Sequence, residues 1–164
     1  MTTTTTTTTI DTTAIATADQ RYLAPSKGDE LFNRIARRLT RMGLSVKGSR
    51  ELRVVGRKSG EIRTTVVNLL ELDGERYLVA PRGTTEWVRN IRAAGGGELK
   101  VGRRSESFAI DEVADAEKAP ILREYLVRWA FEVGRFFDGI DAQSTDEELA
   151  AVAPGFPVFR LTAA

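Results

Sequence analysis

The residues with the clearest capacity for chemistry stand in one short stretch, Gly56 to Thr65, with the sequence GRKSGEIRTT. Arg57, Lys58 and Arg63 place three cations in it, and two glycines punctuate it. A glycine-bounded turn that gathers cations and backbone N–H groups can bind a phosphate or a carboxylate. Taken alone, the stretch is more typical of a solvated basic hairpin tip.

Two residue types that often carry catalysis are missing, because the chain has no cysteine and no histidine. This excludes a thiolate nucleophile, a Ser-His-Asp triad and the usual zinc sites. Redox chemistry would then depend on a cofactor that brings its own reactivity. We therefore predict no metal site and name no catalytic residue.

Composition indicates one ordinary globular domain, with 164 residues of which 41% are hydrophobic and 29% charged. No apolar run approaches the ~20 residues that span a bilayer, and the first residues lack a secretory signal pattern. These features predict a cytoplasmic location. Residues 1–63 carry 12 Lys and Arg against 6 Asp and Glu. Aromatic residues are not interleaved with these charges, so we expect no nucleic-acid partner.

The elements that must position the cationic stretch follow from apolar spacing and turn signals. Residues 1–27 begin with a threonine run and are predicted to form a disordered tail. Gly28 to Leu44 is predicted to be a helix with one basic face, which would pack on the domain or lie on the inner face of a membrane. Asp73-Gly74 is a strong hairpin signal between apolar runs. The predicted strands are Glu51–Gly56, Ile62–Leu72, Tyr77–Pro81, Leu99–Gly102, Ser105–Val113 and Pro157–Leu161. The other predicted helices are Glu86–Ala94, Asp115–Phe137 and Thr145–Val152.

This order predicts one α+β domain over residues 28–164. Its centre would be a mainly antiparallel, six-stranded β-barrel with flanking helices. Asp115 is expected to cap the long helix, Thr84 or Thr85 the short helix, and Gly95-Gly96-Gly97 to end the short helix.

The ordered motifs G-R-K-S-G-x-x-R-T-T, the D-G hairpin, a glycine loop and W-x-x-N-I-R-A together resemble the deazaflavin-dependent nitroreductase family. The resemblance runs from about Leu31 to Leu161 and is strongest from Gly56 to Ala94. It implies the split β-barrel of FMN-binding type. It also implies the polyanionic deazaflavin coenzyme F-420 as cofactor, with FMN as the alternative.

The resemblance also implies cofactor-binding residues. Lys58 and Arg63 match the phosphate contacts, and Arg57, Ser59 and Gly60 lie in the same turn. The other matching positions are Thr64 and Thr65 beside the deazaflavin, Ala80, Arg82 and Gly83 in a closing loop, and Trp87 and Asn90 on the short helix.

The implied function is hydride transfer from the reduced deazaflavin to a small hydrophobic acceptor such as a quinone, an enone or a nitro compound. Solvent or Tyr77 would supply the proton. The alternatives are an FMN-dependent reductase and a non-catalytic carrier of a flavin, a tetrapyrrole or a lipid on the same fold. A homodimer is a further expectation by analogy with split barrels.

Overall fold

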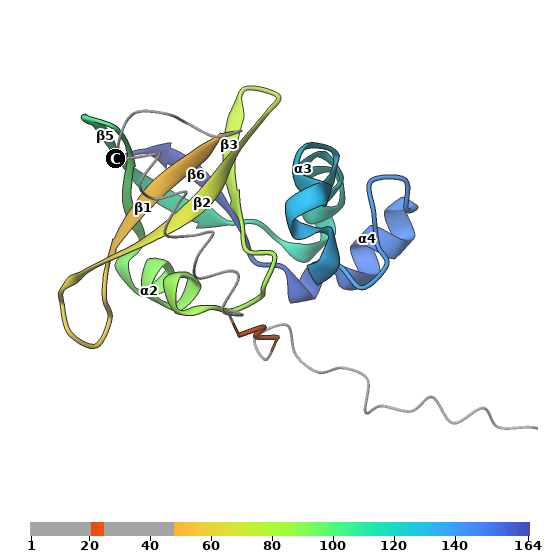
Figure 1. Ribbon diagram of the computed structural model, residues 1–164, viewed down its shortest axis with the longest axis horizontal. Coiled ribbons are helices and arrows are strands. Elements are labelled where there is room, and N and C mark those ends of the chain that lie inside the picture. Colours follow the sequence, from red (N-terminus) through yellow and green to blue (C-terminus); the bar gives the residue numbers. More distant parts are fainter. Residues whose placement is uncertain (1–20, 25–47) are drawn as a thin grey trace, which may run out of the picture.

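The computed structural model of the chain describes residues 21–24 and 48–164. Six antiparallel strands form a closed barrel in the order β1-β2-β3-β6-β5-β4 (Figure 1). Their bounds are β1 Ser49–Val55, β2 Ile62–Leu72, β3 Glu75–Val79, β4 Gly96–Val101, β5 Arg104–Glu112 and β6 Val158–Ala163. This architecture confirms the predicted α+β fold on an antiparallel six-stranded barrel. The helix predicted over 28–44 and most of the predicted tail lie outside the described residues.

Three α-helices accompany the barrel in the described part of the chain. The helix α2 (Glu86–Ala94) lies below the barrel in Figure 1, and α3 (Lys118–Val133) and α4 (Asp146–Val152) lie together on one side. Short 3-10 turns at Asp115–Glu117, Gly134–Phe136 and Ala153–Gly155 join these elements. The site predicted from the sequence therefore falls at the end of the barrel that carries α2 and the β1–β2 loop.

Two hydrophobic cores hold this arrangement. The first fills the barrel with inward-facing side chains such as Leu52, Leu78 and Phe159, and α2 closes it with Val88 and Ile91. The second lies between the outer face of β2 and β3 and the helices α3 and α4. It contains Leu70, Tyr77, Leu122, Leu126 and Trp129, among others. Because strand residues alternate between the two faces, β2 and β3 contribute to both cores.

Several local predictions are confirmed. Asp73 and Gly74 both have positive φ, 52° and 81°, and join β2 to β3 as a two-residue hairpin. Gly95 ends α2 in the left-handed conformation. Thr145 caps α4 with a capping box, in which its side chain accepts from the Glu148 amide.

The prediction of one helix from Asp115 to Phe137 is wrong. The segment divides into two 3-10 turns around α3, and Trp129 has non-helical angles of φ −130° and ψ 16°. Asp115 does not cap a helix, because its carboxylate binds the buried Lys118 ammonium at 2.6 Å. An ion pair between neighbouring turns thus replaces the expected cap.

The first strand of the second hairpin begins earlier than predicted, because Gly96 and Gly97 belong to β4 rather than to the end of the helix. A β-carbon on Gly96 would lie 2.2 Å from the Phe108 carbonyl oxygen. Gly96 thus permits the close approach of β4 to β5, and Gly97 also lies tightly against β1, where a β-carbon would be 2.8 Å from the Arg53 carbonyl oxygen.

Candidate functional site

The turn between β1 and β2 is closed by its own backbone. The Gly56 amide donates to the Glu61 carbonyl at 2.8 Å, and the Gly60 amide donates to the Gly56 carbonyl at 2.8 Å. The Ser59 hydroxyl accepts from the Glu61 amide and from the Arg63 guanidinium, both at 3.3 Å. The structure thus brings Ser59, Gly60 and Arg63 together, as the sequence predicted.

Arg57 fixes this turn to helix α2. Its guanidinium donates to the Glu86 carboxylate at 2.8 Å and to the Asn90 side-chain oxygen at 2.9 Å. Its backbone amide donates to the same Asn90 oxygen at 3.2 Å. The hydrogen bond from Arg57 lowers the pKa of Glu86 below its ordinary value. We call these contacts the Arg57 latch, and they engage the charge of Arg57 within the protein.

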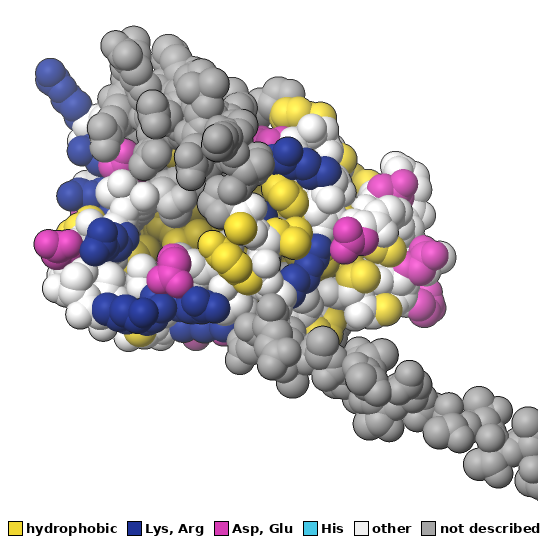
Figure 2. Space-filling view, turned by 60° about the horizontal axis from the view of Figure 1, so that its bottom comes forward, with side chains coloured by type: hydrophobic (Ala, Val, Ile, Leu, Met, Phe, Trp, Pro, Cys, Tyr) yellow, Lys and Arg dark blue, Asp and Glu magenta, His cyan; other side chains and the backbone are white. Residues whose placement is uncertain are grey.

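Two cations of the turn remain available for an anion. Lys58 is exposed and makes no ion pair with any residue that the structure describes. The side chain of Arg63 is 61% exposed, and its ion pair with the similarly exposed Glu61 is long, at 3.3 Å. Such exposed pairs contribute little, so Arg63 can exchange Glu61 for a ligand oxygen at small cost. Figure 2 shows Lys and Arg side chains gathered on the side of the molecule where the β1–β2 hairpin projects.

Thr64 and Thr65 cannot both face one ligand with their side chains. They are adjacent on β2, where Thr64 pairs with Arg53 and Thr65 pairs with Leu52. Leu52 is fully buried inside the barrel. Strand alternation places Thr65 on the same, inward face and Thr64 on the outer face. Only one of these two predicted residues can therefore present its hydroxyl to a given cofactor.

The predicted closing loop lies against an N-terminal segment. Ala80 is buried and its amide donates to the Pro157 carbonyl at 2.9 Å. Arg82 donates from Nε to the Leu23 carbonyl at 2.8 Å. Gly83 forms an isolated antiparallel bridge with Tyr22. Residues 21–24 belong to the range predicted as an unstructured tail, and nothing in their composition predicted this contact.

Trp87 and Asn90 lie on α2, as predicted. The Trp87 ring meets the Phe159 ring edge-on, with centroids 5.9 Å apart. Phe159 is a core residue of the barrel, so this contact anchors α2 on the barrel end. Trp87 keeps part of its surface accessible, whereas Asn90 is 5% exposed and is committed to the Arg57 latch.

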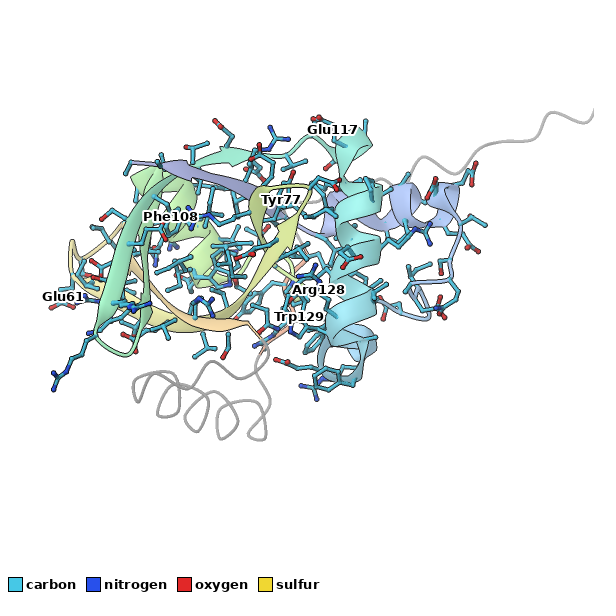
Figure 3. All side chains as sticks on the ribbon, turned by 90° about the horizontal axis from the view of Figure 1, so that it is seen from above. Glu61, Tyr77, Phe108, Glu117, Arg128 and Trp129 are labelled. Atoms are coloured by element: carbon cyan, nitrogen blue, oxygen red, sulfur yellow. The ribbon has the colours of Figure 1, made fainter. Side chains whose placement is uncertain are left out.

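Tyr77, the candidate proton donor, lies away from the turn. It belongs to the core between the barrel and α3 and is buried. Figure 3 shows Tyr77 on the side of the barrel that faces α3, whereas Glu61 lies at the opposite end of the view. The structure therefore gives no support to Tyr77 as a proton donor beside Lys58 and Arg63.

Two hydroxyl groups next to the closing loop were missed as site residues. The side-chain oxygens of Thr84 and Thr85 are buried and have no hydrogen-bond partner in the described part of the chain. Thr85 is the N-cap residue of α2, but its side chain does not cap the helix. The sequence signal was present, since one of the two residues, Thr84 or Thr85, was predicted to cap the helix. Buried hydroxyls without partners are rare in folded proteins, and a bound water, an ion or a ligand would each satisfy them.

No group of acidic or other ligating side chains that could hold a metal ion occurs among the described residues. No helix in the described ranges is long and apolar enough to cross a membrane. The available donors, two cations and two unpaired hydroxyls around α2, instead suit the phosphate and carboxylate oxygens of an anionic cofactor.

The closed, six-stranded antiparallel barrel has the architecture of the split-barrel fold. Residues 32–138 match the F420H(2)-dependent quinone reductase family, and the chain belongs to this family. It is accordingly a deazaflavin-dependent oxidoreductase with coenzyme F-420 as its cofactor.

Solved structures with the same fold are distant in sequence. A protein of unknown function from Agrobacterium tumefaciens, Atu2129, is 18% identical over 79% of this chain and 54% of that chain, with a TM-score of 0.52. This chain thus matches about half the length of that protein. A structure described as a domain-swapped dimer is 16% identical over 84% of this chain and 100% of that chain, with a TM-score of 0.51. An F420-H2 dependent reductase, FDR-A, is 16% identical over 70% of this chain and 94% of that chain, with a TM-score of 0.48. No curated protein matches the chain.

Proposed function

We propose that the protein transfers a hydride from the reduced deazaflavin to a small hydrophobic acceptor, with a quinone, an enone or a nitro compound as candidate substrates. The observation that carries this proposal is the turn of Lys58 and Arg63, which the Arg57 latch holds against α2. A protein of this family needs a place for the anionic end of its cofactor, and these two cations are available for it.

In this proposal the chain binds and orients, and the bound cofactor supplies the hydride. Lys58 and Arg63 hold phosphate oxygens through charge-assisted hydrogen bonds. Ser59 and Gly60 set the shape of the turn, and Trp87 offers a partly accessible aromatic ring on α2. Holding donor and acceptor in a fixed geometry is itself a large source of rate acceleration.

The preference for a hydrophobic acceptor is supported by apolar surface at the base of the turn. Val55 and Ile62 are paired across β1 and β2, and 46% and 51% of their surfaces are exposed. A flat apolar substrate would gain by covering this pair. A quinone becomes a hydroquinone by taking one hydride and one proton, and solvent supplies the proton in this proposal.

The test is fluorescence titration of the full chain with the deazaflavin coenzyme and, separately, with FMN. We expect saturable binding of the deazaflavin and much weaker binding of FMN. Adding menadione, an enone or a nitroaromatic to the complex with the reduced coenzyme should then restore the absorbance of the oxidised coenzyme. Binding without oxidation by any of the three acceptor classes would refute the acceptor proposal and favour a carrier.

A homodimer belongs to the same proposal, by analogy with the domain-swapped dimer among the similar structures. Light scattering after size exclusion should then give twice the 18.1 kDa of the chain. A mass equal to one chain at the concentration of the assay would refute it.

A further inference from the structure

A short N-terminal segment covers the loop that leads into α2. We call residues 21–24 the cover segment. The Thr84 amide donates to the Arg21 carbonyl at 2.8 Å, and the Leu23 amide donates to the Arg82 carbonyl at 3.1 Å. The pairing is antiparallel, like an added edge strand. In Figure 1 this segment lies beside the loop that joins β3 to α2.

The fit of the cover segment is close at Gly83. A β-carbon there would lie 2.0 Å from the Arg21 carbonyl oxygen, and φ of Gly83 is +76°. Only glycine allows the loop and the cover segment to approach in this way. The contact is therefore a specific pairing.

Arg21 anchors the cover segment on the far side of the loop. Its guanidinium lies over the Phe156 ring, 4.2 Å from the centroid, and donates to the Phe136 carbonyl. A longer contact of 3.5 Å reaches the exposed Asp138 carboxylate. This side chain is the main attachment of the segment besides its backbone.

Next to the loop that pairs with the cover segment, two buried hydroxyls have no hydrogen-bond partner in the described part of the chain. Thr84 is 4% exposed, and its hydroxyl has no partner among the described residues; the same holds for the hydroxyl of Thr85. Both residues stand at the N-terminus of α2, where free backbone N–H groups and the helix dipole favour an anion. The Arg82 guanidinium is engaged with the Leu23 carbonyl rather than with a charged group.

We propose that the cover segment is a detachable, autoinhibitory strand. It conceals an oxyanion site formed by Arg82, Thr84 and Thr85. When it detaches, it frees the Arg82 guanidinium and the Thr84 amide, which join the two hydroxyls that already lack a partner. All of these donate to a phosphate or carboxylate oxygen, and the hydroxyls that lacked a partner gain one. This inference rests on the proposed function, because the occupant is a carboxylate of the coenzyme's glutamate tail, whereas Lys58 and Arg63 hold its phosphate.

The first test weakens the anchor of the cover segment in the full chain. Arg21→Ala should raise the affinity for the complete coenzyme about tenfold, since the loss of a hydrogen bond from a charged group has about this size. Its affinity for the deazaflavin chromophore without phosphate and tail should stay within about twofold. Arg103→Ala in the exposed β4–β5 turn is the matched control and should change neither affinity. Unchanged or weaker binding of the complete coenzyme by Arg21→Ala would overturn the proposal.

The second test removes one unpaired hydroxyl at nearly constant volume. Thr84→Val should raise the melting temperature of the ligand-free protein, because a buried polar atom without a partner is gone. The same variant should bind the complete coenzyme about tenfold more weakly, and Thr84→Ser should restore the affinity. A higher melting temperature without loss of affinity would mean that Thr84 has only a structural role, and the oxyanion site would be refuted.

A third measurement separates this inference from the proposed function. Hydrogen exchange of the Leu23 amide should accelerate in inorganic phosphate, whether or not the protein binds deazaflavin. Acceleration by phosphate without deazaflavin binding would refute the proposed function and retain the covered oxyanion site. If the protein binds deazaflavin but the exchange rate of the Leu23 amide changes with neither ligand, the detachable cover segment is refuted and the proposed function is retained. No effect of either ligand would refute both.

Discussion

Replacing Lys58 by alanine should separate ligand binding from folding more cleanly than any other change in the cationic turn. Lys58 is exposed and has no ion pair with a described residue, so its removal should alter the free energy of unfolding by less than about 0.5 kcal/mol. If it holds a phosphate oxygen of the coenzyme, one charge-assisted hydrogen bond is lost. Such a loss costs about 1.5–3 kcal/mol, which is about 10- to 150-fold in affinity.

Two further variants of the same turn, Arg63→Ala and Arg57→Ala, are compared with Lys58→Ala. Arg63→Ala should behave like Lys58→Ala, because its only ion pair to a described residue is the exposed 3.3 Å contact with Glu61. Arg57→Ala should instead lower the stability of the ligand-free protein more than its affinity for the coenzyme. It loses the Glu86 and Asn90 contacts of the latch and should lower the free energy of unfolding by about 1–2 kcal/mol.

The assay is fluorescence titration with the deazaflavin coenzyme at two salt concentrations, combined with urea denaturation of the ligand-free protein. The affinity lost in Lys58→Ala and Arg63→Ala should shrink as salt rises, because exposed charges are screened. Full affinity in both variants would refute the assignment of the turn to the phosphate. A larger loss of stability in Lys58→Ala than in Arg57→Ala would refute the division between binding and latch residues.

Three other predictions concern the supports of the site. Asn90→Ala should lower the free energy of unfolding by about 1–3 kcal/mol in urea denaturation, because both donors of Arg57 lose their buried acceptor. Because the pKa of Glu86 is lowered in the folded protein, its ionised carboxylate stabilises the fold above pH 4.5, and this stabilisation is lost as pH falls through the lower folded pKa. The free energies of unfolding of wild type and Glu86→Gln should therefore converge on acidification. A difference between them that stays constant with pH would contradict the latch. Leu122→Ala should lower the free energy of unfolding by about 2–5 kcal/mol, because Leu122 on α3 is fully buried. Val127→Ala, at a residue of α3 that is 62% exposed, should cost less than about 0.5 kcal/mol, and equal thermal shifts would contradict the packing of α3 on the barrel.

The barrel could be predicted from the sequence because its signals are local. The Asp73-Gly74 hairpin needs only two residues with positive φ between apolar runs, and the structure has both. The capping box at Thr145 spans four residues and is likewise complete in the structure. Strand alternation then assigns most inward-facing positions, such as Leu52 and Leu78, to the core.

The long helix was mispredicted because its apolar spacing continues across places where tertiary contacts change the backbone. Trp129 packs against Tyr125, with ring centroids 5.0 Å apart, and its backbone leaves the helical region. Asp115 has the chemistry of a cap, yet the buried Lys118 ammonium competes for its carboxylate. Periodicity predicts which residues are buried, but it does not predict how a bulky side chain is accommodated.

The candidate site was predictable in its residue types and only partly in their roles. Charge and glycine spacing identified the turn, and they cannot say which cation is engaged within the protein. Arg57 binds Glu86, 29 positions away, and Lys58 is left unpaired by the described residues. Adjacent cations therefore have different expected functions, because only one of them meets a carboxylate on α2.

The docking of the cover segment could not be predicted from the sequence, because it depends on contacts with residues far away in the chain. Arg21 approaches residues more than a hundred positions away, and the partner of its backbone is the loop at Gly83. The threonine-rich tail predicts little to bury, yet backbone pairing with the loop at Gly83 and the Arg21 guanidinium over Phe156 dock residues 21–24. A contact held by so few groups can be displaced by one oxyanion that satisfies Arg82 and the two threonine hydroxyls. Access to the site therefore depends on the balance between the cover segment and the ligand.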